Sequence, residues 1–147
     1  MELCTRLARF KKENKELLTY LLFEAHDEQA YVDGVKAAVD VAFDDIRSQR
    51  RSLLGGVNLY LVKKSLRKTL RLVNKHIRFS GSKHVEVQLL MHFLAALNDS
   101  GVGYKKNAVL VNLYKQQLKK IEKAANTLHE DLQHDYANGL QRLRDAL

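Results

Sequence analysis

Lysine and arginine recur through the middle of the chain without a carboxylate among them. Residues 47 to 83 contain eleven Lys and Arg residues and no Asp or Glu. If residues from about 57 to 79 form a helix, six of these cations lie within about 60° of one direction, because successive residues turn by about 100°. We call these six the basic ridge: Lys64, Arg67, Lys68, Arg71, Lys75 and Arg78.

Such a ridge can neutralise backbone phosphates, and its arginines can add bidentate contacts. Tyr60 and Asn74 border it and could stack on nucleobases or hydrogen-bond to them. No zinc-finger, RRM or KH signature accompanies it, so phosphate contacts would dominate and sequence preference would be weak. The sequence predicts a non-enzymatic module that binds a polyanion, with RNA or DNA favoured over an acidic protein.

The preceding segment has the opposite charge. Residues 24 to 46 contain seven acidic residues and one basic residue. On a helix, Asp33, Asp40 and Asp44 lie roughly opposite the apolar Val35 and Val39, so they point outward. These carboxylates could neutralise the basic ridge within the chain, or the two charged faces could complement each other between copies. The sequence leaves both alternatives open.

One spacing within the basic segment concerns enzymatic activity. Arg71 and His76 are separated by four residues, which resembles the Arg-x4-His spacing of the HEPN ribonucleases, a family of small helical proteins. The resemblance covers six residues, and Leu72 stands where that family tends to have a polar residue. It implies that Arg71 would bind the scissile phosphate and that His76 would act in acid–base catalysis. On one uninterrupted helix the two side chains diverge by about 140°, so this site requires a distortion or a second subunit.

Histidines do not recur at a convincing metal-binding spacing. His129 and His134 are five residues apart, which on a helix directs them about 140° apart. His84, Gln88 and His92 share a helix side but span two turns, and glutamine rarely ligates a metal. The sequence has no phosphate-binding glycine loop, nucleophile elbow or paired-carboxylate motif. We expect no metal, no cofactor and no small-molecule ligand, and favour a binding protein over an enzyme.

The positions of these residues depend on helices. The 147 residues include no proline and only 7 glycines, which predicts an all-α fold in a single domain, residues 1–147. Glycine and serine at 55–56, 80–82 and 100–103 and an N-cap at Asp27 separate the helices. The predicted segments are about 2–25, 27–51, 57–79, 82–99 and 105–146. We expect an antiparallel bundle of four to five helices with a long C-terminal helix.

Apolar residues recur at helical spacing in each segment and predict the core-facing sides. Leu3, Leu7, Phe10, Leu17 and Leu21 form this stripe in the first segment. The last segment would be about 60 Å long as one helix, although Asn138-Gly139 could break it near its end. Its overhang could pair with a second copy, so the alternative function is an adaptor or self-associating bundle, with a homodimer as one form.

The single cysteine, Cys4, cannot form an intrachain disulfide, which favours the cytoplasm. Cys4 lies in the first turn of the predicted helix, near Leu3 and Leu7, so we expect it to be a half-buried apolar residue. The longest early apolar run, residues 17–23, is too short to span a bilayer. We therefore expect no membrane partner.

Overall fold

The computed structural model describes residues 2–52 and 59–147, and within these ranges it is all-helical, without strands. The predicted all-α class is confirmed. Besides its α-helices, the described part of the chain has a π-helical turn, η1 (Tyr20–Glu24), and a 3-10 turn, η2 (Tyr104–Lys106). The α-helices are α1 (Glu2–Phe10), α2 (Lys12–Thr19), α3 (Glu28–Ser52), α4 (Leu59–Ser80), α5 (Lys83–Asp99), α6 (Ala108–Ala125) and α7 (Glu130–Asp145).

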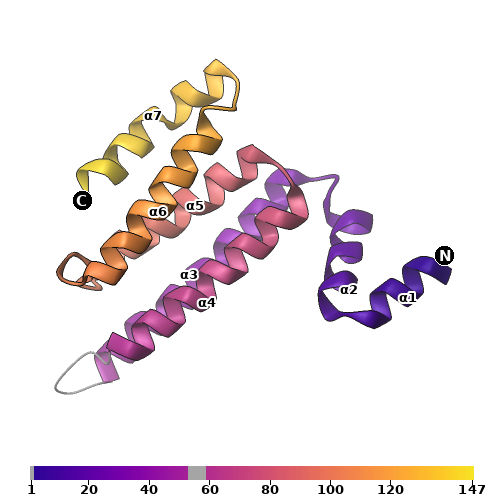
Figure 1. Ribbon diagram of the computed structural model, residues 1–147, viewed down its shortest axis with the longest axis horizontal. Coiled ribbons are helices and arrows are strands. Elements are labelled where there is room, and N and C mark those ends of the chain that lie inside the picture. The colour runs from indigo at the N-terminus through magenta and orange to yellow at the C-terminus, as the bar shows by residue number, and fades with distance from the viewer. Residues whose placement is uncertain (1, 53–58) are drawn as a thin grey trace.

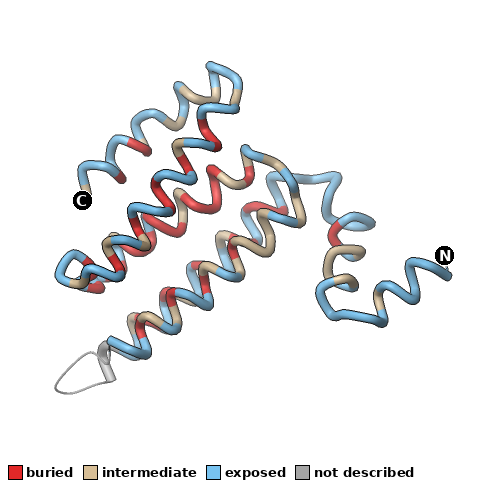
Figure 2. Tube along the Cα trace, viewed as in Figure 1, coloured by how far each residue is buried: buried red, intermediate tan, exposed pale blue. Residues whose placement is uncertain are grey.

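Helix α5 lies at the centre of the core. It packs against α3, α4, α6 and α7, and it is apolar on several sides, with Leu89, Leu90, Phe93 and Leu94 fully buried. A helix that is apolar all round must be covered by neighbours, whereas an amphipathic helix needs only one. Figure 1 shows α3 and α4 as an antiparallel pair and α5–α7 beside them, and Figure 2 shows the buried residues gathered where these helices face one another. We call α3–α7 the helical body.

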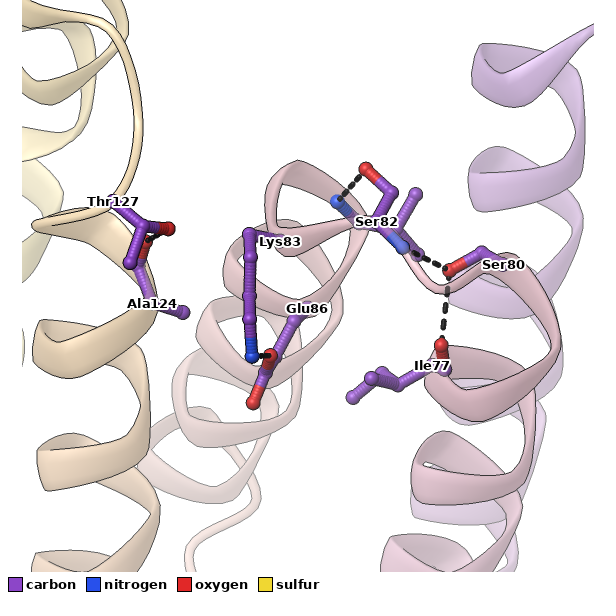
Figure 3. Close-up of polar contacts among 8 residues, drawn as sticks. Ile77, Ser80, Ser82, Lys83, Glu86, Ala124 and Thr127 are labelled. Carbon is purple, nitrogen blue, oxygen red and sulfur yellow. Dashed lines mark hydrogen bonds and ion pairs between the residues drawn. The ribbon is translucent and has the colours of Figure 1, made fainter.

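The turn between α4 and α5 is the one expected at residues 80–82. Gly81 has φ +63°, a left-handed conformation that suits glycine at a helix end. The hydroxyl of Ser80 donates a hydrogen bond to the carbonyl of Ile77 (3.0 Å) and accepts one from the backbone N–H of Ser82 (3.3 Å) (Figure 3). The hydroxyl of Ser82 then accepts the amide of Val85 and caps α5. These bonds set the direction in which α4 and the basic ridge run relative to α5.

The long C-terminal helix was a wrong prediction, because the chain reverses between Ala125 and Glu130. The hydroxyl of Thr127 donates to the carbonyl of Ala124 (2.7 Å; Figure 3), and Nδ1 of His129 caps α7 by accepting the amide of Asp131 (3.2 Å). The reversal lets α7 return along α6 and bury Leu140 and Leu143. The expected overhang is therefore replaced by a packed helix.

The expected break at Asn138-Gly139 instead lies inside α7. A Cβ on Gly139 would lie 2.5 Å from Cε of Met91, so a larger residue there would require the flexible end of the Met91 side chain to move.

The first predicted helix is also divided. Lys11 is extended (φ −141°, ψ 143°) and separates α1 from α2, so α1 projects from the helical body (Figure 1). Together with the reversal after Ala125, this division raises the helix count above the expected four to five. We call residues 2–24 the N-terminal arm.

The apolar stripe of the N-terminal arm does not enter the core. Leu3, Leu7 and Phe10 are 71%, 48% and 79% exposed. Leu21 is also exposed, and Leu17 alone of the five predicted residues packs against the core. Cys4 is exposed, which corrects the half-buried expectation. The helical periodicity is present, but the bend at Lys11 leaves this face of α1 uncovered by any helix of the described residues.

Two valines of α3 test where the core ends. Val39 is fully buried, whereas Val41, two residues later, is 62% exposed. Val39→Ala should lower the free energy of unfolding by about 2 kcal/mol, because it removes buried methyl groups and leaves a cavity. Val41→Ala should leave it within about 0.5 kcal/mol of wild type. Urea unfolding followed by circular dichroism measures both, and equal losses would contradict the described packing of α3.

Candidate polyanion-binding site

Helix α4 holds the basic ridge on its outer side because its other side is buried. Val62, Leu66 and Val73 are covered by the helical body. On the ridge, Lys64, Arg67, Lys68, Arg71 and Arg78 are exposed and Lys75 is half-buried. The structure thus places all six predicted residues along one helix, which spans about 21 Å from Lys64 to Arg78.

Lys75 differs from the other ridge residues because it pairs within the chain. Its Nζ lies 2.7 Å from Oε2 of Glu16, on α2. This hydrogen bond lowers the pKa of Glu16, and the charges of Lys75 and Lys12 lower it further, while burial opposes the shift. For the other five ridge residues, no carboxylate of residues 2–49 or 59–147 lies within ion-pair distance.

The carboxylates of α3 do not neutralise the basic ridge within the chain. Asp33 accepts the amide nitrogen of Gln29 (2.9 Å), Asp40 pairs with His92 (2.7 Å), and Asp44 pairs with Arg47 (2.6 Å). Each contact stays on α3 or crosses to α5. Both charged faces therefore point outward in one molecule, as their helical periodicity predicts.

The surface around the ridge is concave in two places. A cavity of about 230 Å³ lies near the start of α4. One of its lining residues is Lys63, a cation of the same acid-free run that was not predicted as part of the ridge. Its lining residues are Tyr60, Lys63, Lys64, Arg67 and Arg71. A second, of about 570 Å³, is lined by Glu13, Lys68, Arg71, Leu72, Asn74, Lys75 and Arg78. Asn74, expected to border the ridge, lines this second cavity.

Tyr60 continues the line of cations toward the start of α4. It is 71% exposed and lies four, seven and eleven residues before Lys64, Arg67 and Arg71, which is the spacing of one helix face. The N-terminus of α4 is the positive end of its helix dipole, and no acidic residue in the first turn offsets it. The dipole therefore adds to the positive potential of the nearby cations. An aromatic ring thus stands beside four cations in one hollow.

Arg71 and His76 are not brought together in one chain. Arg71 lies in the two basic hollows, whereas His76 lines cavities between α3 and the N-terminal arm. The hydroxyl of Tyr31 hydrogen-bonds to Nδ1 of His76, and Phe79 packs against the edge of the imidazole. The divergence expected from an uninterrupted helix is therefore present, and a HEPN-like pair does not form within this chain.

The environment of His76 favours its neutral form. Burial lowers the pKa of His76 and the charge of Lys75 lowers it further, whereas Glu16 acts in the opposite direction. Burial raises the pKa of Tyr31, so its hydroxyl stays protonated and can donate to the imidazole. Sequence reasoning missed this contact, which joins residues 45 positions apart and leaves no periodic signal.

The histidines considered for metal binding have separate partners. Nε2 of His84 bonds to the hydroxyl of Tyr136 (2.6 Å) and lies 3.3 Å from Nε2 of Gln88, while His92 pairs with Asp40. Across the ranges 2–52 and 59–147, no three His, Cys, Asp or Glu side chains cluster closely enough to hold a metal ion. In the same ranges, no helix has the length and apolar character needed to cross a membrane.

Comparison of the chain with protein-family models, curated proteins and solved structures finds no match.

The half-buried His76 predicts a pH dependence of stability. Its pKa is lowered on folding, so below about pH 6.5 the unfolded chain binds a proton that the folded chain does not. The contribution of neutral His76 to the free energy of unfolding is fully present above about pH 6.5. It is lost as the pH falls toward the lowered pKa, by at most about 1.4 kcal/mol per pH unit. His76→Gln, which cannot titrate, should flatten the slope of unfolding free energy between pH 7 and pH 5.

Urea unfolding at several pH values measures this slope. His134→Gln on α7 is the control, because His134 is exposed, and it should keep the wild-type slope. The interpretation fails if His76→Gln and wild type lose stability equally over this interval.

Proposed function

We propose that the protein is a non-enzymatic module that binds the phosphate backbone of RNA or DNA through the basic ridge of α4. The observation that carries this proposal is the row of five exposed cations with no carboxylate partner in the described part of the chain. They stand on a helix whose opposite side is buried, so their spacing is held by the core.

The ridge carries an electrostatic cost that a polyanion would offset. Lys64 with Lys68, and Arg67 with Arg71, are like charges four residues apart, which destabilises an isolated helix by a few tenths of a kcal/mol per pair. A nucleic acid offers phosphates at regular short intervals, and binding releases the counterions that they hold. Five contacts would give a slope of log K against log salt of about −4 to −5 on duplex DNA.

Three features favour nucleic acid over an acidic protein. The ridge extends over about 21 Å, comparable to about six base-pair steps. Three of its cations are arginines, whose planar guanidinium groups suit phosphate oxygens. Tyr60 adds an exposed ring at one end.

A cytoplasmic location is part of the proposal, since the exposed thiol of Cys4 would stay reduced there.

Charge reversal on the ridge tests the proposal. Lys64→Glu, Arg67→Glu and Arg71→Glu combined should weaken binding of a fluorescent 20-nucleotide probe at least about tenfold, because each removed phosphate contact also removes counterion release. Fluorescence anisotropy from 50 to 300 mM salt measures the affinity and the slope. We expect wild-type dissociation constants between about 1 and 100 μM near physiological salt.

The matched control reverses Lys115, Lys119 and Lys123, three exposed lysines of α6 spaced along that helix. Both triple variants have the same net charge, so the control should bind within about threefold of wild type if the position of the cations decides binding. No wild-type binding at 50 mM salt, or equal losses in the two variants, would refute the proposed function.

Tyr60 predicts a difference between single strands and duplexes. A base unstacked from its neighbours can stack on the ring, which contributes about 1–3 kcal/mol per base, whereas paired bases are not available. Tyr60→Leu should therefore weaken single-strand binding by this amount and leave duplex binding unchanged. Tyr60→Phe, which keeps the ring, should bind both as wild type does. If Tyr60→Leu weakened binding of both probes equally, the stacking role of Tyr60 would be contradicted, whereas the proposed phosphate contacts of the ridge would stand.

A further inference from the structure

Helix α1 presents an apolar face without a matching cover in the described part of the chain. Leu3, Leu7 and Phe10 are exposed and stand at positions i, i+4 and i+7. The extensive packing of α1 within residues 2–52 and 59–147 is with α2. Three large side chains at this spacing are the anchors with which an amphipathic helix enters an apolar groove.

A groove on the outer side of α3 has a suitable shape. It has a volume of about 430 Å³ and lies between η1 and α3. Its lining residues are Phe23, Glu24, His26, Asp27, Ala30, Tyr31, Gly34, Val35, Ala38 and His76. The small residues Ala30, Gly34 and Ala38 leave room above the helix, and a Cβ built on Gly34 would meet nothing within 4 Å.

The charges of the helix and the groove are complementary. Glu24 and Asp27 line the groove, in a segment with seven acidic residues and one basic residue between positions 24 and 46. Arg6 flanks the Leu3–Leu7–Phe10 face at about 65° from its centre, whereas Arg9 lies about 130° away on the opposite side of α1. Arg6 pairs with Glu2 at 3.2 Å, and both side chains of this pair are exposed, so the pair is weak. With the apolar face in the groove, Arg6 would lie beside the acidic rim formed by Glu24 and Asp27.

The chain's own α1 is directed away from this groove. The Glu16–Lys75 ion pair and the packing of Tyr20 on Tyr31 and Phe79 hold the later part of the N-terminal arm against the helical body. The extended Lys11 then turns α1 outward (Figure 1). A second copy of the chain has the same groove and the same basic apolar helix.

We propose that α1 of one copy binds the α3 groove of a second copy. Because each copy offers one helix and one groove, two copies can exchange helices reciprocally and close as a two-fold dimer. The contact uses none of the six ridge residues, so this proposal is independent of the proposed function.

Variants on both surfaces test the contact. Leu7→Asp removes the central anchor, and Gly34→Leu fills the groove from an exposed position at which an added Cβ meets nothing within 4 Å. Each should raise the dimer dissociation constant at least about tenfold in sedimentation equilibrium, and Val109→Asp should not, because Val109 is an exposed apolar residue of α6 outside both surfaces. A wild-type chain that stays monomeric up to about 100 μM overturns the proposal, as does a dimer unaffected by Leu7→Asp and Gly34→Leu.

A disulfide trap distinguishes exchange between copies from docking within one chain. Cys4 lies on α1, and Ala38→Cys would put a second thiol in the groove. An added disulfide, such as oxidised glutathione, accepts the two electrons and two protons that the pair of thiols releases. We expect a covalent dimer on a non-reducing gel, and mass spectrometry should find a peptide that links Cys4 to the thiol introduced at position 38.

Wild type controls for links between the Cys4 thiols of two copies, which would give no such peptide. A link from Cys4 to position 38 within a monomer, or no link at all, overturns the proposal. The charge pair offers an independent check: Arg6→Glu should weaken the dimer, and adding Glu24→Arg should restore it. A failure of Glu24→Arg to restore the dimer would contradict the placement of Arg6 at the acidic rim.

Discussion

The burial of α5 is the constraint on which the helical body depends. Its apolar residues occupy several sides, so α3, α4, α6 and α7 must each turn an apolar face toward it. Burial of these side chains contributes roughly 1.5–3 kcal/mol each, far more than surface ion pairs do. The charged sides of α3 and α4 consequently face outward, even though this leaves like charges together on α4. The two proposals assign different partners to these faces, because the regular row of cations suits phosphates and the acidic groove suits a basic helix.

The junction between the N-terminal arm and the body is a second, more polar constraint. Tyr20, Tyr31, His76 and Phe79 pack together, and the Glu16–Lys75 ion pair lies beside them. This junction positions two surfaces at once: the groove of α3 and the end of the basic ridge at Lys75. It also contains the half-buried imidazole of His76, whose protonation opposes folding.

The sequence by itself determined the helical class, the turn at Ser80-Gly81-Ser82 and the outward direction of the basic ridge. These features follow from local rules: helix breakers are scarce, glycine and serine satisfy a helix end, and residues turn by about 100° along a helix. The charge distribution could also be read directly, since it needs no knowledge of distant neighbours.

Tertiary structure alone decided which apolar stripes are covered and which polar groups are paired. The stripes of α1 and α5 are both apolar, yet within residues 2–52 and 59–147 the stripe of α5 is covered by four helices and that of α1 is exposed. The reversal after Ala125 is accompanied by burial of Leu140 and Leu143, and the pairs Tyr31–His76 and Asp40–His92 join residues far apart in the chain. Periodicity gives the direction of a side chain from its own helix axis, but what that side chain meets depends on where the other helices pack.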